Sequence, residues 1–479
     1  MISRDFNTVH TKNFAVIPFN YTPINNKYLV SNMLGSWDFL NKDELQTLNS
    51  FRCEKGTLLF NRLHNSGIIM DEGNYEEVLS GYVKLNGHLF GDTGLHIAVI
   101  TTRCNLNCRY CQTKLSKKND MSLGVAAKVL DYLFSVRSRM VTLEFQGGEP
   151  LLNWEVFSFL VENARKLNRR IGKDLRLALV TNGTLLDEQK NKFLSDFDVS
   201  VCISLDGPEY VHDKNRVYAN GKGTYKQIIK NIKKFKKSSA KYVGLIPTIT
   251  KHSFRHHKEI IDEYMKLNQS TIALRPVNSI GNACNNWYCL GYTAEEFIDF
   301  YKRSMDYILE LNRLGTAIKE RTAVVMLKKI LGKTDPGFVD LMSPCGAGRG
   351  QIVYMPDGSC YPCDESRMLD EEMFKLGNIK EDKYEELMKK ENLLHLLEAS
   401  LISCWDYASA FSQWLGTCPI INYASQKNIV PKIWCSSLHK IYNAQFKYLF
   451  EKMEEDNKNI SIFKKWIMKK EEKNGQDKA

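Results

Sequence analysis

Six short apolar runs follow one another through the middle of the chain, each trailed by a segment long enough for a helix or loop. Runs of this length, rich in β-branched residues, are typical of buried strands. Strands that alternate with helices predict a parallel sheet, which right-handed crossovers curl into a full or partial barrel with its functional residues at the strands' carboxyl ends. The runs are HIAVITT (96–102), VTLEFQG (141–147), RLALVTN (176–182), VSVCISL (199–205), YVGLIPT (242–248) and TIALRPV (271–277).

The pattern changes on both sides of these runs. Before residue 95, short alternations that favour strands (NKYLVSN, KGTLLFN) mix with a helical stretch (KDELQTLNSF), as in a small α+β module. A helical stretch, AEEFIDFYKRSMDYILELNRL, then precedes a cysteine-bearing segment that we interpret as a separate module, and the last residues, EEKNGQDKA, are predicted to be disordered. We divide the chain into residues 1–94, 95–315, 316–450 and a charged helical or disordered tail, 451–479.

The composition is that of an ordinary globular chain of 479 residues, 43% of them hydrophobic and 25% charged. The net charge of +11 is concentrated in helical stretches such as KQIIKNIKKFKKSSAKY, which lack interleaved aromatic residues, so a solvated helix face is favoured over a nucleic-acid site. With no bilayer-spanning run and no secretory signal core, we expect a cytoplasmic protein without a membrane partner. In that reducing compartment, 13 cysteines indicate metal or cluster ligation rather than disulfides.

Three cysteines stand in one loop directly after the first predicted strand. Cys104, Cys108 and Cys111 have the spacing C-x3-C-x2-C. A zinc site normally takes four ligands, whereas three thiolates on a [4Fe–4S] cluster leave one iron open. S-adenosylmethionine can chelate such an iron through its amino and carboxylate groups, which brings its sulfonium next to a low-potential cluster. Buried or zinc-bound cysteines are the alternative.

The loop RCNLNCRYC, with the aromatic Tyr110 before its last cysteine, resembles that of the radical S-adenosylmethionine superfamily. The resemblance implies a partial (β/α)6 barrel that cleaves S-adenosylmethionine reductively to methionine and a 5′-deoxyadenosyl radical, with Tyr110 near the adenine. The segment EFQGGEP after the second strand resembles the superfamily's site for the methionine amine. Gly147 and Gly148 would let the backbone approach the cofactor, and Glu149 would accept a hydrogen bond from the ammonium.

Polar side chains at the ends of the third and fourth strands match the superfamily's order of cofactor-binding residues. Hydroxyls and carboxylates suit a ribose, and an arginine suits the methionine carboxylate. Either stretch could equally cap the helix that follows it. Arg275, in the sixth strand, either faces the cofactor or substrate or forms a structural ion pair. The cofactor-binding candidates in these stretches are Thr181, Asn182, Ser204, Asp206 and Arg216.

The segment CGAGRGQIVYMPDGSCYPCDE resembles the opening of the SPASM domain, the auxiliary-cluster module of radical enzymes that act on peptides. Its PDG turn would present Cys363 on a hairpin. The family's later group of four cysteines is incomplete here, so the resemblance implies one auxiliary cluster, while a cluster-free module held by packing or zinc is the alternative. The implied ligands are Cys345, Cys360, Cys363 and Cys418, and the cysteines left over, a vestigial or zinc-like pair, are Cys404 and Cys435.

Asp364 directly follows Cys363. In sulfatase-maturing relatives an aspartate at this position accepts the substrate proton, which makes Asp364 the candidate catalytic base. An acid beside a cluster cysteine can equally cap the turn, so both roles stay open.

Over most of its length the chain resembles the His-Xaa-Ser system radical maturases, which are thought to modify ribosomal peptides, although its cysteines are closer to those of general SPASM enzymes. The resemblance implies an oxidoreductase-type maturase that removes hydrogen from a precursor peptide to install a cross-link or an oxidised side chain. Its partners would be that peptide and an external one-electron donor such as flavodoxin or ferredoxin. Residues 1–94 would bind the leader part of the peptide as an added edge strand.

Other functions remain open. A sulfatase-type (formylglycine) maturase would use the same chemistry. A non-catalytic iron–sulfur electron carrier would not need the GGEP motif beside its cluster. An RNA-modifying radical enzyme is less favoured, because the second cysteine module resembles the branch that acts on peptides.

Overall fold

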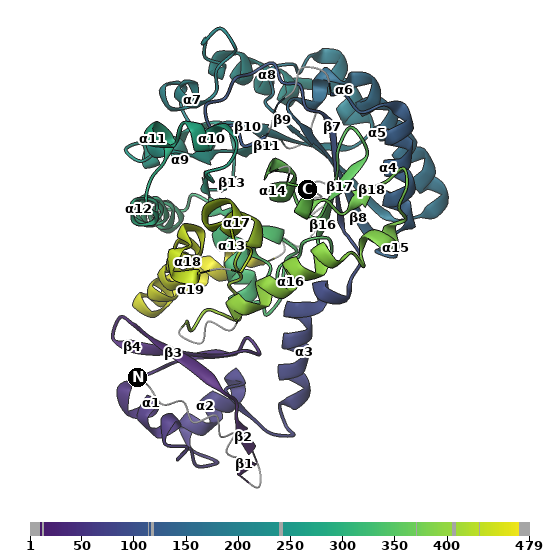
Figure 1. Ribbon diagram of the computed structural model, residues 1–479. Coiled ribbons are helices and arrows are strands. Elements are labelled where there is room, and N and C mark those ends of the chain that lie inside the picture. The colour runs from purple at the N-terminus through teal and green to yellow at the C-terminus, as the bar shows by residue number, and fades with distance from the viewer. Residues whose placement is uncertain are drawn as a thin grey trace.

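The computed structural model describes residues 10–11, 14–113, 115, 119–238, 243–369, 371–404, 409–430 and 432–468. Figure 1 shows a curved sheet with helices on its outer side, a group of C-terminal helices across its open side, and an N-terminal module beyond those helices.

All six apolar runs form strands of a parallel, curved arrangement, to which residues 319–320 outside the runs add one more short strand, and this confirms the predicted α/β barrel class. The strands are β7 (Leu95–Thr101), β8 (Met140–Gly147), β9 (Asp174–Thr181), β10 (Val199–Ser204), β11 (Val243–Ile246), β12 (Thr248–Ile249), β13 (Thr271–Ile272), β14 (Arg275–Pro276) and β15 (Lys319–Glu320). The main sheet has the order β11-β10-β9-β8-β7. Pro247 splits the fifth run because it has no N–H for the ladder, and the short strands then pair in parallel, β12 with β14 and β13 with β15.

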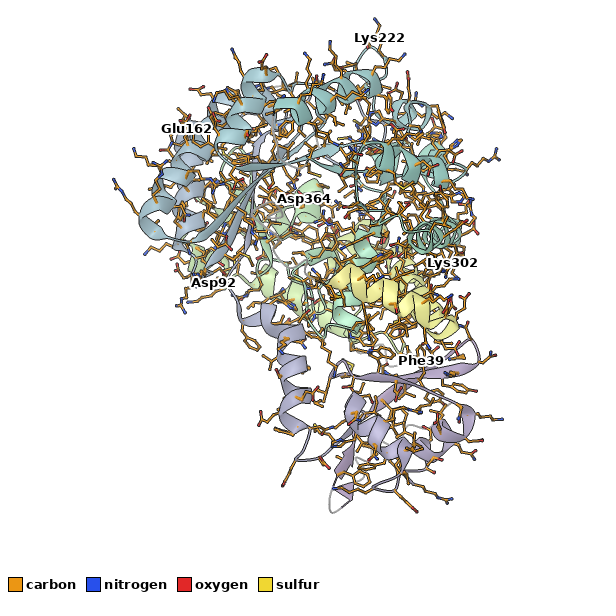
Figure 2. All side chains as sticks on the ribbon, turned by 180° about the vertical axis from the view of Figure 1, so that it is seen from behind. Phe39, Asp92, Glu162, Lys222, Lys302 and Asp364 are labelled. Carbon is orange, nitrogen blue, oxygen red and sulfur yellow. The ribbon has the colours of Figure 1, made fainter. Side chains whose placement is uncertain are left out.

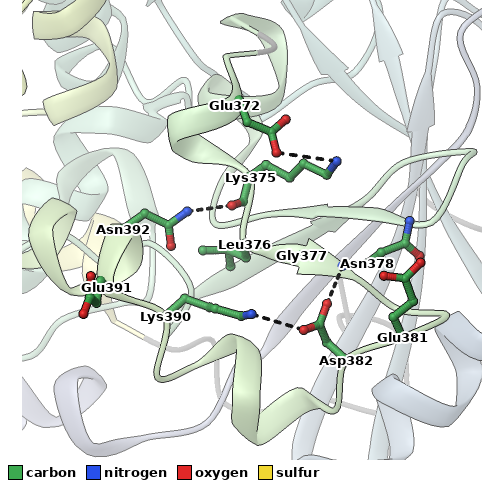
Figure 3. A pocket seen from close by; sticks show the side chains of 10 residues that line it. All are labelled: Glu372, Lys375, Leu376, Gly377, Asn378, Glu381, Asp382, Lys390, Glu391 and Asn392. Atoms are coloured by element: carbon green, nitrogen blue, oxygen red, sulfur yellow. Dashed lines mark hydrogen bonds and ion pairs between the residues drawn. The ribbon is translucent and has the colours of Figure 1, made fainter.

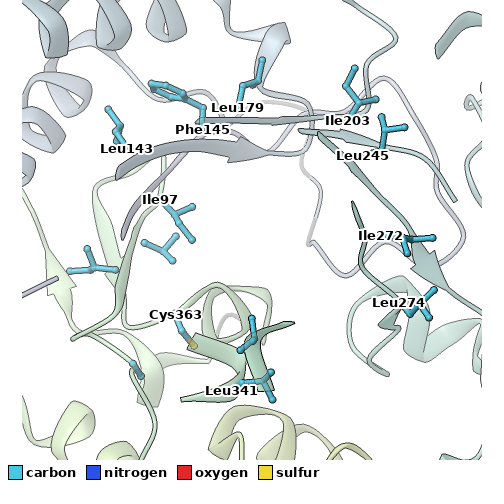
Figure 4. Packing of buried hydrophobic residues seen from close by; sticks show 14 of the residues in the cluster. Ile97, Leu143, Phe145, Leu179, Ile203, Leu245, Ile272, Leu274, Leu341 and Cys363 are labelled. Atoms are coloured by element: carbon cyan, nitrogen blue, oxygen red, sulfur yellow. The ribbon is translucent and has the colours of Figure 1, made fainter. Parts of the chain in front are cut away.

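Side chains alternate between the two faces of each barrel strand. In β8, Val141, Leu143 and Phe145 are fully buried, whereas Glu144 and Gln146 keep some solvent-accessible surface. Figure 4 shows Leu143 and Phe145 on the outer side of the curved sheet, toward the helices. Glu144 and Gln146 therefore lie on the concave face, where they are half-buried. We call the space that this concave face borders the lumen.

Amphipathic helices cover the outer face of the sheet (Figure 1). They are α4 (Leu123–Ser135), α5 (Trp154–Ile171), α6 (Glu188–Asp196), α7 (Glu209–Asn215), α8 (Tyr225–Ser238), α9 (His257–Lys266) and α12 (Ala294–Arg313). The strongly basic α8 buries Ile228, Ile232 and Phe235 on one side. This confirms the prediction that its lysines belong to a solvated helix face.

The N-terminal module is a small α+β unit, as predicted. Its described residues form two antiparallel sheets and three α-helices: β1 (His10–Thr11), β2 (Phe14–Val16), β6 (Ile69–Met70), β3 (Phe19–Ile24), β4 (Lys27–Asn32), β5 (Trp37–Leu40), α1 (Lys42–Asn49), α2 (Leu58–Ser66) and α3 (Tyr75–Asn86). Its own core includes Val30, Leu40, Leu48 and Phe60.

One strand prediction in this module is wrong. The alternation in KGTLLFN (55–61) is the start of helix α2. The Thr57 hydroxyl accepts a hydrogen bond from the Phe60 N–H (3.2 Å), which caps the helix, while Phe60 and Leu63 form its buried face. A short alternation of apolar and polar residues fits either a strand or a helix. Here the capping threonine, three residues before a buried position, favours the helix.

The C-terminal part continues the barrel sheet. Its elements are α13 (Arg321–Ile330), β16 (Gln351–Tyr354), β17 (Ser359–Tyr361), α14 (Asp364–Leu369), β18 (Gly377–Asn378), α15 (Tyr384–Leu387), α16 (Glu391–Cys404), α17 (Pro419–Gln426), α18 (Ser437–Glu455) and α19 (Asn457–Ile467). Strand β16 pairs in parallel with β7 and antiparallel with β17, which forms the predicted hairpin around the PDG turn. Helix α14 follows that hairpin on the concave side of the barrel sheet, and Asp364 lies there in the view from behind (Figures 1 and 2).

Helix α18 joins the N-terminal module to the rest of the molecule. The Trp37 ring packs edge-on against Phe450 of α18 with centroids 5.1 Å apart, and its Nε1–H donates to the Ile330 carbonyl (3.0 Å). The predicted disorder of residues 471–479 lies outside the described residues. Among the helices that are described, none combines the length and the apolar character needed to cross a membrane.

Candidate functional site

The first cysteine loop (residues 102–113) begins where β7 ends, at the carboxyl edge of the sheet. Neighbouring chain holds its backbone in place. The Asn107 N–H donates to the Val217 carbonyl (2.8 Å), and the Arg109 N–H donates to the Asn215 carbonyl (2.9 Å). The loop is therefore a clamped element whose cysteines project from a fixed backbone.

Burial raises the pKa of the three thiols in this loop, to about 11 for Cys104, to about 12 for Cys108 and above its ordinary value for Cys111. Cys111 raises the pKa of Cys104 further, and both Cys104 and Cys111 raise that of Cys108. Arg216 lowers all three. Thiolates at this position therefore need positive charge, which an iron centre provides.

Three thiols in one loop match the ligand set of a [4Fe–4S] cluster with one open iron. Within the described residues, no three His, Cys, Asp or Glu side chains close around one metal ion. In a cubane cluster each thiolate binds a different iron, so the ligands stand farther apart than those of one ion. Cys104, Cys108 and Cys111 would hold three irons of a [4Fe–4S] cluster and leave the fourth to S-adenosylmethionine.

The glycine pair after β8 lies directly against the cysteine loop. A Cβ on Gly147 would stand 2.1 Å from the Thr101 carbonyl oxygen, and one on Gly148 would stand 2.1 Å from that of Arg103. The close approach lets the Gly148 N–H donate to Thr101 (2.9 Å) and the Glu149 N–H donate to Arg103 (2.8 Å). Only glycine fits at these two positions, because any side chain would separate the two loops.

Glu149 connects this turn to the end of β9. Its fully buried carboxylate accepts hydrogen bonds from the Thr181 hydroxyl (2.8 Å), the Asn182 N–H (2.8 Å) and the Leu151 N–H (3.1 Å). Burial, as the largest cause, raises the pKa of Glu149 to about 7 against the effect of these bonds. Three residues proposed for cofactor binding thus form one network, in which Asn182 also donates to Asn105 of the cysteine loop (2.9 Å).

Asp206, which follows β10, is hydrogen-bonded to two of the remaining cofactor-binding candidates. Its buried carboxylate accepts from the Tyr110 hydroxyl (2.8 Å), from Arg216 Nε (3.1 Å) and from the Thr248 N–H (3.0 Å). The Arg216 guanidinium also lies over the Tyr110 ring, 5.1 Å from its centroid. Asp206 therefore positions Tyr110 and Arg216 beside the cysteine loop, while Ser204 lies half-buried at the end of its strand, at the same edge of the sheet.

Three of the four cysteines proposed for an auxiliary cluster come together. Cys345 and Cys418 raise the pKa of Cys363, and Cys345 raises that of Cys418, in each case after burial and the nearby Glu365. Glu365 also raises the pKa of Cys345, which burial lifts to about 11. Cys345, Cys363 and Cys418 are therefore near enough to influence one another's pKa, and Glu365 influences all three.

Cys360 lies apart from these three thiols. It is in strand β17, and the charged groups that raise its pKa after burial are Asp382 and Asp357 rather than another thiol. Cys435 is exposed in a short turn (Ile433–Cys435). Cys404 ends helix α16, and its side chain lies outside the described residues.

Asp364 is the first residue of α14, and its carboxylate accepts a hydrogen bond from Arg367 Nε (2.7 Å). Arg367 also donates to Gln146 of β8 (3.0 Å), the residue before the glycine pair. Arg367 thus holds Asp364, the candidate catalytic base, at the lumen, and it is bonded at the same time to the strand that leads into the glycine pair.

The sequence left two roles open for Arg275, and the structure shows the structural ion pair. Its guanidinium lies 3.5 Å from an Asp340 oxygen and 3.4 Å from Glu365. These three residues, with Cys418 and Tyr442, line a small cavity of about 20 Å³.

A larger cleft, of about 540 Å³, lies elsewhere (Figure 3). It is lined by residues between Glu372 and Asn392, among them Gly377 and Asn378 of β18, and its lining includes no cysteine. Both of its lysines are in ion pairs, Lys375 with Glu372 (3.8 Å) and Lys390 with Asp382 (3.2 Å). Nothing in it indicates chemistry, so the lumen is the candidate site.

The structure adds residues that the sequence did not single out. Arg367 is one, and its i,i+3 spacing from Asp364 on a helix was the available signal. Asn286 is another: its side chain donates to the Arg109 carbonyl (2.9 Å), and the neighbouring Asn282 N–H donates to the Cys111 carbonyl (2.8 Å). The segment that covers the cysteine loop in this way had no distinguishing motif.

Two family models match the chain: "Radical SAM superfamily" over residues 98–264 and "Iron-sulfur cluster-binding domain" (SPASM) over residues 345–406. The cysteine-type anaerobic sulfatase-maturating enzyme of Clostridium perfringens (strain 13 / Type A) is 30% identical over 323 residues, which are 64% of this chain and 82% of that one.

Two solved structures share the fold. Native anSMEcpe with bound AdoMet matches with a TM-score of 0.67 at 23% identity, covering 78% of this chain and 99% of its own. Streptococcus suis SuiB bound to precursor peptide SuiA matches with a TM-score of 0.53 at 12% identity, covering 86% of this chain and 96% of its own.

Proposed function

Because the chain belongs to the radical S-adenosylmethionine superfamily and carries its SPASM extension, we propose that it is a maturase that oxidises a residue of a ribosomally made precursor peptide. One observation supports this most directly. Helix α14, which starts at Asp364 directly after Cys363, is hydrogen-bonded through Arg367 to the strand that leads into the glycine pair. The cofactor site and the auxiliary thiols therefore border one lumen, where a single substrate residue can meet both.

When bound, the cluster and S-adenosylmethionine supply a 5′-deoxyadenosyl radical, at the cost of one electron from an external donor such as flavodoxin or ferredoxin. Asp364 would accept the proton that the substrate residue gives up, and an auxiliary cluster held by the second cysteine set would supply the electron acceptor that a loss of two hydrogens requires. Glu149, Arg216 and Tyr110 bind and orient the cofactor in this scheme. The residue leaves with two hydrogens fewer, as a cross-link or an oxidised side chain.

The N-terminal module is proposed to bind the leader part of the peptide. SuiB, which shares the fold, has been crystallised with its precursor peptide SuiA, which supports a peptide partner. The module has two small antiparallel sheets, and an extended peptide can add to an edge strand of such a sheet. We also propose a cytoplasmic location, because both the clusters and the precursor require a reducing compartment.

Co-expression with short open reading frames next to the gene tests this proposal. Mass spectrometry should find a peptide that loses two hydrogens per event with the wild-type enzyme and with Cys53→Ala, a matched change of a buried cysteine in the N-terminal module. The same peptide should stay unmodified with Cys104→Ala. A precursor that is modified equally by Cys104→Ala would contradict the proposal.

A sulfatase-type maturase is the second candidate, supported by the relative that is 30% identical and by Asp364 after Cys363. Such an enzyme converts a cysteine or serine to formylglycine, which carries an aldehyde. A hydrazide probe on a sulfatase-derived peptide therefore separates the two: labelling would favour this candidate, whereas loss of two hydrogens without labelling in the neighbouring precursor favours the first.

A further inference from the structure

The first cysteine loop turns one side toward solvent. Asn107 and Arg109, which flank Cys108, are both exposed, whereas Tyr110 is buried on the side of Asp206. The electron that starts the proposed reaction comes from outside the chain, and electron transfer slows steeply with distance. The outer side of this loop is therefore a direct way from solvent to the thiols.

Arg109 and Lys214 lie on neighbouring segments at this surface. The Arg109 N–H donates to the Asn215 carbonyl (2.9 Å), and Lys214 directly precedes Asn215 at the end of α7. The side chains of Arg109 and Lys214 are exposed. The backbone hydrogen bond thus brings two positive charges to the outer side of the loop.

A second segment, residues 251–256, extends the same surface. The Tyr210 ring of α7 packs on the His256 ring, with centroids 5.0 Å apart. The segment begins with a short 3-10 helix (Lys251–Ser253) that also contacts α7, and Lys251 is exposed on it. A third positive charge therefore lies on an element that packs against the helix of Lys214.

We call Arg109, Lys214 and Lys251 the basic patch. Burial lowers the pKa of His252, and the charges of Lys214 and Arg109 lower it further, which agrees with the packing of these segments. Three positive side chains are thus gathered beside the cysteine loop, although they come from three separate parts of the sequence.

The acidic residues of α7 do not neutralise the basic patch. Glu209 pairs with Lys226 (3.2 Å), and Asp213 accepts hydrogen bonds from the N–H groups of Thr224 (2.8 Å) and Tyr225 (2.9 Å). Both carboxylates are therefore held by other parts of the protein. The charge of the patch is left for a partner in solution.

An exposed aromatic ring borders the basic patch. Tyr288, in the short helix α11 (Trp287–Leu290), is 87% exposed. Helix α11 contacts the 3-10 helix that carries Lys251, and Asn286 just before it donates to the Arg109 carbonyl (2.9 Å). Tyrosine and arginine are the side chains that most often anchor a protein partner. Figure 1 shows α7 and α11 far from the N-terminal module, so a partner here would leave that module free.

We propose that the basic patch, together with Tyr288, is the docking surface for a small acidic one-electron carrier of the flavodoxin or ferredoxin class, which reduces the cluster of the first cysteine loop. The carrier gives up one electron and the cluster gains it, with no transfer of atoms or protons. Electron-transfer partners meet through small interfaces, and opposite charges speed their encounter. The inference rests on the proposed function, which requires such a donor, but docking can be measured without any turnover.

The first test measures binding of a purified acidic flavodoxin to the full, reconstituted chain at low and high salt. Lys214→Glu/Lys251→Glu should bind it about 10- to 100-fold more weakly than the wild type at low salt, with a weaker dependence on salt. Tyr288→Ala should weaken binding at both salt concentrations. Lys464→Glu/Lys465→Glu, the matched control with the same charge change at exposed positions of α19, should bind like the wild type.

The second test measures 5′-deoxyadenosine with two reductants. With NADPH, flavodoxin reductase and limiting flavodoxin, Lys214→Glu/Lys251→Glu should form it about 10-fold more slowly than the wild type. With dithionite, a small molecule that needs no docking surface, the two proteins should be equal.

Unchanged flavodoxin affinity and unchanged flavodoxin-driven rate in Lys214→Glu/Lys251→Glu would overturn the inference. An equal loss in the α19 control, or an equal loss with dithionite, would do the same, because it would show a general effect of charge or folding. A wild type that binds flavodoxin through the patch but forms no 5′-deoxyadenosine even with dithionite would instead contradict the proposed function and support the docking surface.

Discussion

Arg367 donates a hydrogen bond of 3.0 Å to Gln146, and this contact ties the auxiliary module to the cofactor side of the lumen. Gln146 directly precedes the glycine pair that supports the cysteine loop, and Arg367 at the same time holds Asp364 at 2.7 Å. The proposed catalytic base is therefore positioned with respect to the radical site, and not only with respect to its own helix.

Replacing Arg367 by alanine should uncouple cleavage of S-adenosylmethionine from modification of the peptide. Without the guanidinium, Asp364 loses its fixed geometry, and misplacement of this kind costs about 10- to 100-fold in rate. We expect peptide modification to fall by that factor while 5′-deoxyadenosine still forms. The ratio of the two products, measured by liquid chromatography and mass spectrometry, checks this. An equal fall in both products would assign Arg367 a general structural role instead.

Changing Gly148 to alanine should disrupt the cofactor site without unfolding the barrel. The new Cβ would stand 2.1 Å from the Arg103 carbonyl oxygen and 3.0 Å from Cys104 Cβ, which forces the two loops apart. S-adenosylmethionine affinity should fall by at least about 100-fold, roughly 3 kcal/mol, in a titration of the reconstituted protein. Gly124→Ala on helix α4, where the nearest atom is 3.9 Å away, should bind the cofactor like the wild type.

The two cysteines of the hairpin should behave differently. Cys363→Ala should lose the auxiliary cluster, because Cys363 belongs to the set with Cys345 and Cys418. Cys360→Ala should keep it and lose only packing, with a cost of about 1 kcal/mol in the free energy of unfolding. Iron analysis of the two variants decides, and loss of iron in both would return Cys360 to the ligand set.

Acid should destabilise the protein through His96, a residue far from catalysis in this account. His96 is fully buried, bonded to the Tyr354 hydroxyl (2.7 Å) and the Thr93 carbonyl (3.3 Å), and burial lowers its pKa from 6.5 to about 3. Between these values the unfolded chain binds a proton that the folded chain does not. The contribution of His96 to the free energy of unfolding is therefore fully present above pH 6.5. It decreases on acidification toward pH 3, by at most about 1.4 kcal/mol per pH unit.

Denaturant unfolding at several pH values checks this contribution. His96→Gln should flatten the acid side of the stability profile, whereas His395→Gln, at an exposed position on α16, should leave it as it is. Parallel profiles for His96→Gln and the wild type would show that the buried imidazole does not govern acid stability.

Much of the architecture could be predicted because its signals were local. The apolar runs marked the strands, and the spacing of Cys104, Cys108 and Cys111 needed no tertiary information. Asp206 shows the limit: a carboxylate at a strand end suggested a ribose, but its oxygens accept from Tyr110 and Arg216. Whether a polar side chain faces a ligand or a neighbour depends on long-range packing.

The auxiliary module was harder to predict for the same reason. Cys360 and Cys363 are three residues apart, yet the hairpin sends them to different environments. Glu365 and Cys418 line the same small cavity only because α14 packs on α17. The Arg367 contact with Gln146 spans more than two hundred residues, beyond any local pattern.

The most direct test of the account is whether the chain cleaves S-adenosylmethionine through its first cysteine loop. Anaerobically reconstituted protein is incubated with dithionite and S-adenosylmethionine, and 5′-deoxyadenosine is measured. The account predicts its formation by the wild type and by Cys53→Ala, and its absence when Cys104, Cys108 and Cys111 are changed to alanine. A cluster-loaded wild type that forms no 5′-deoxyadenosine, or a triple variant that forms as much, would contradict it.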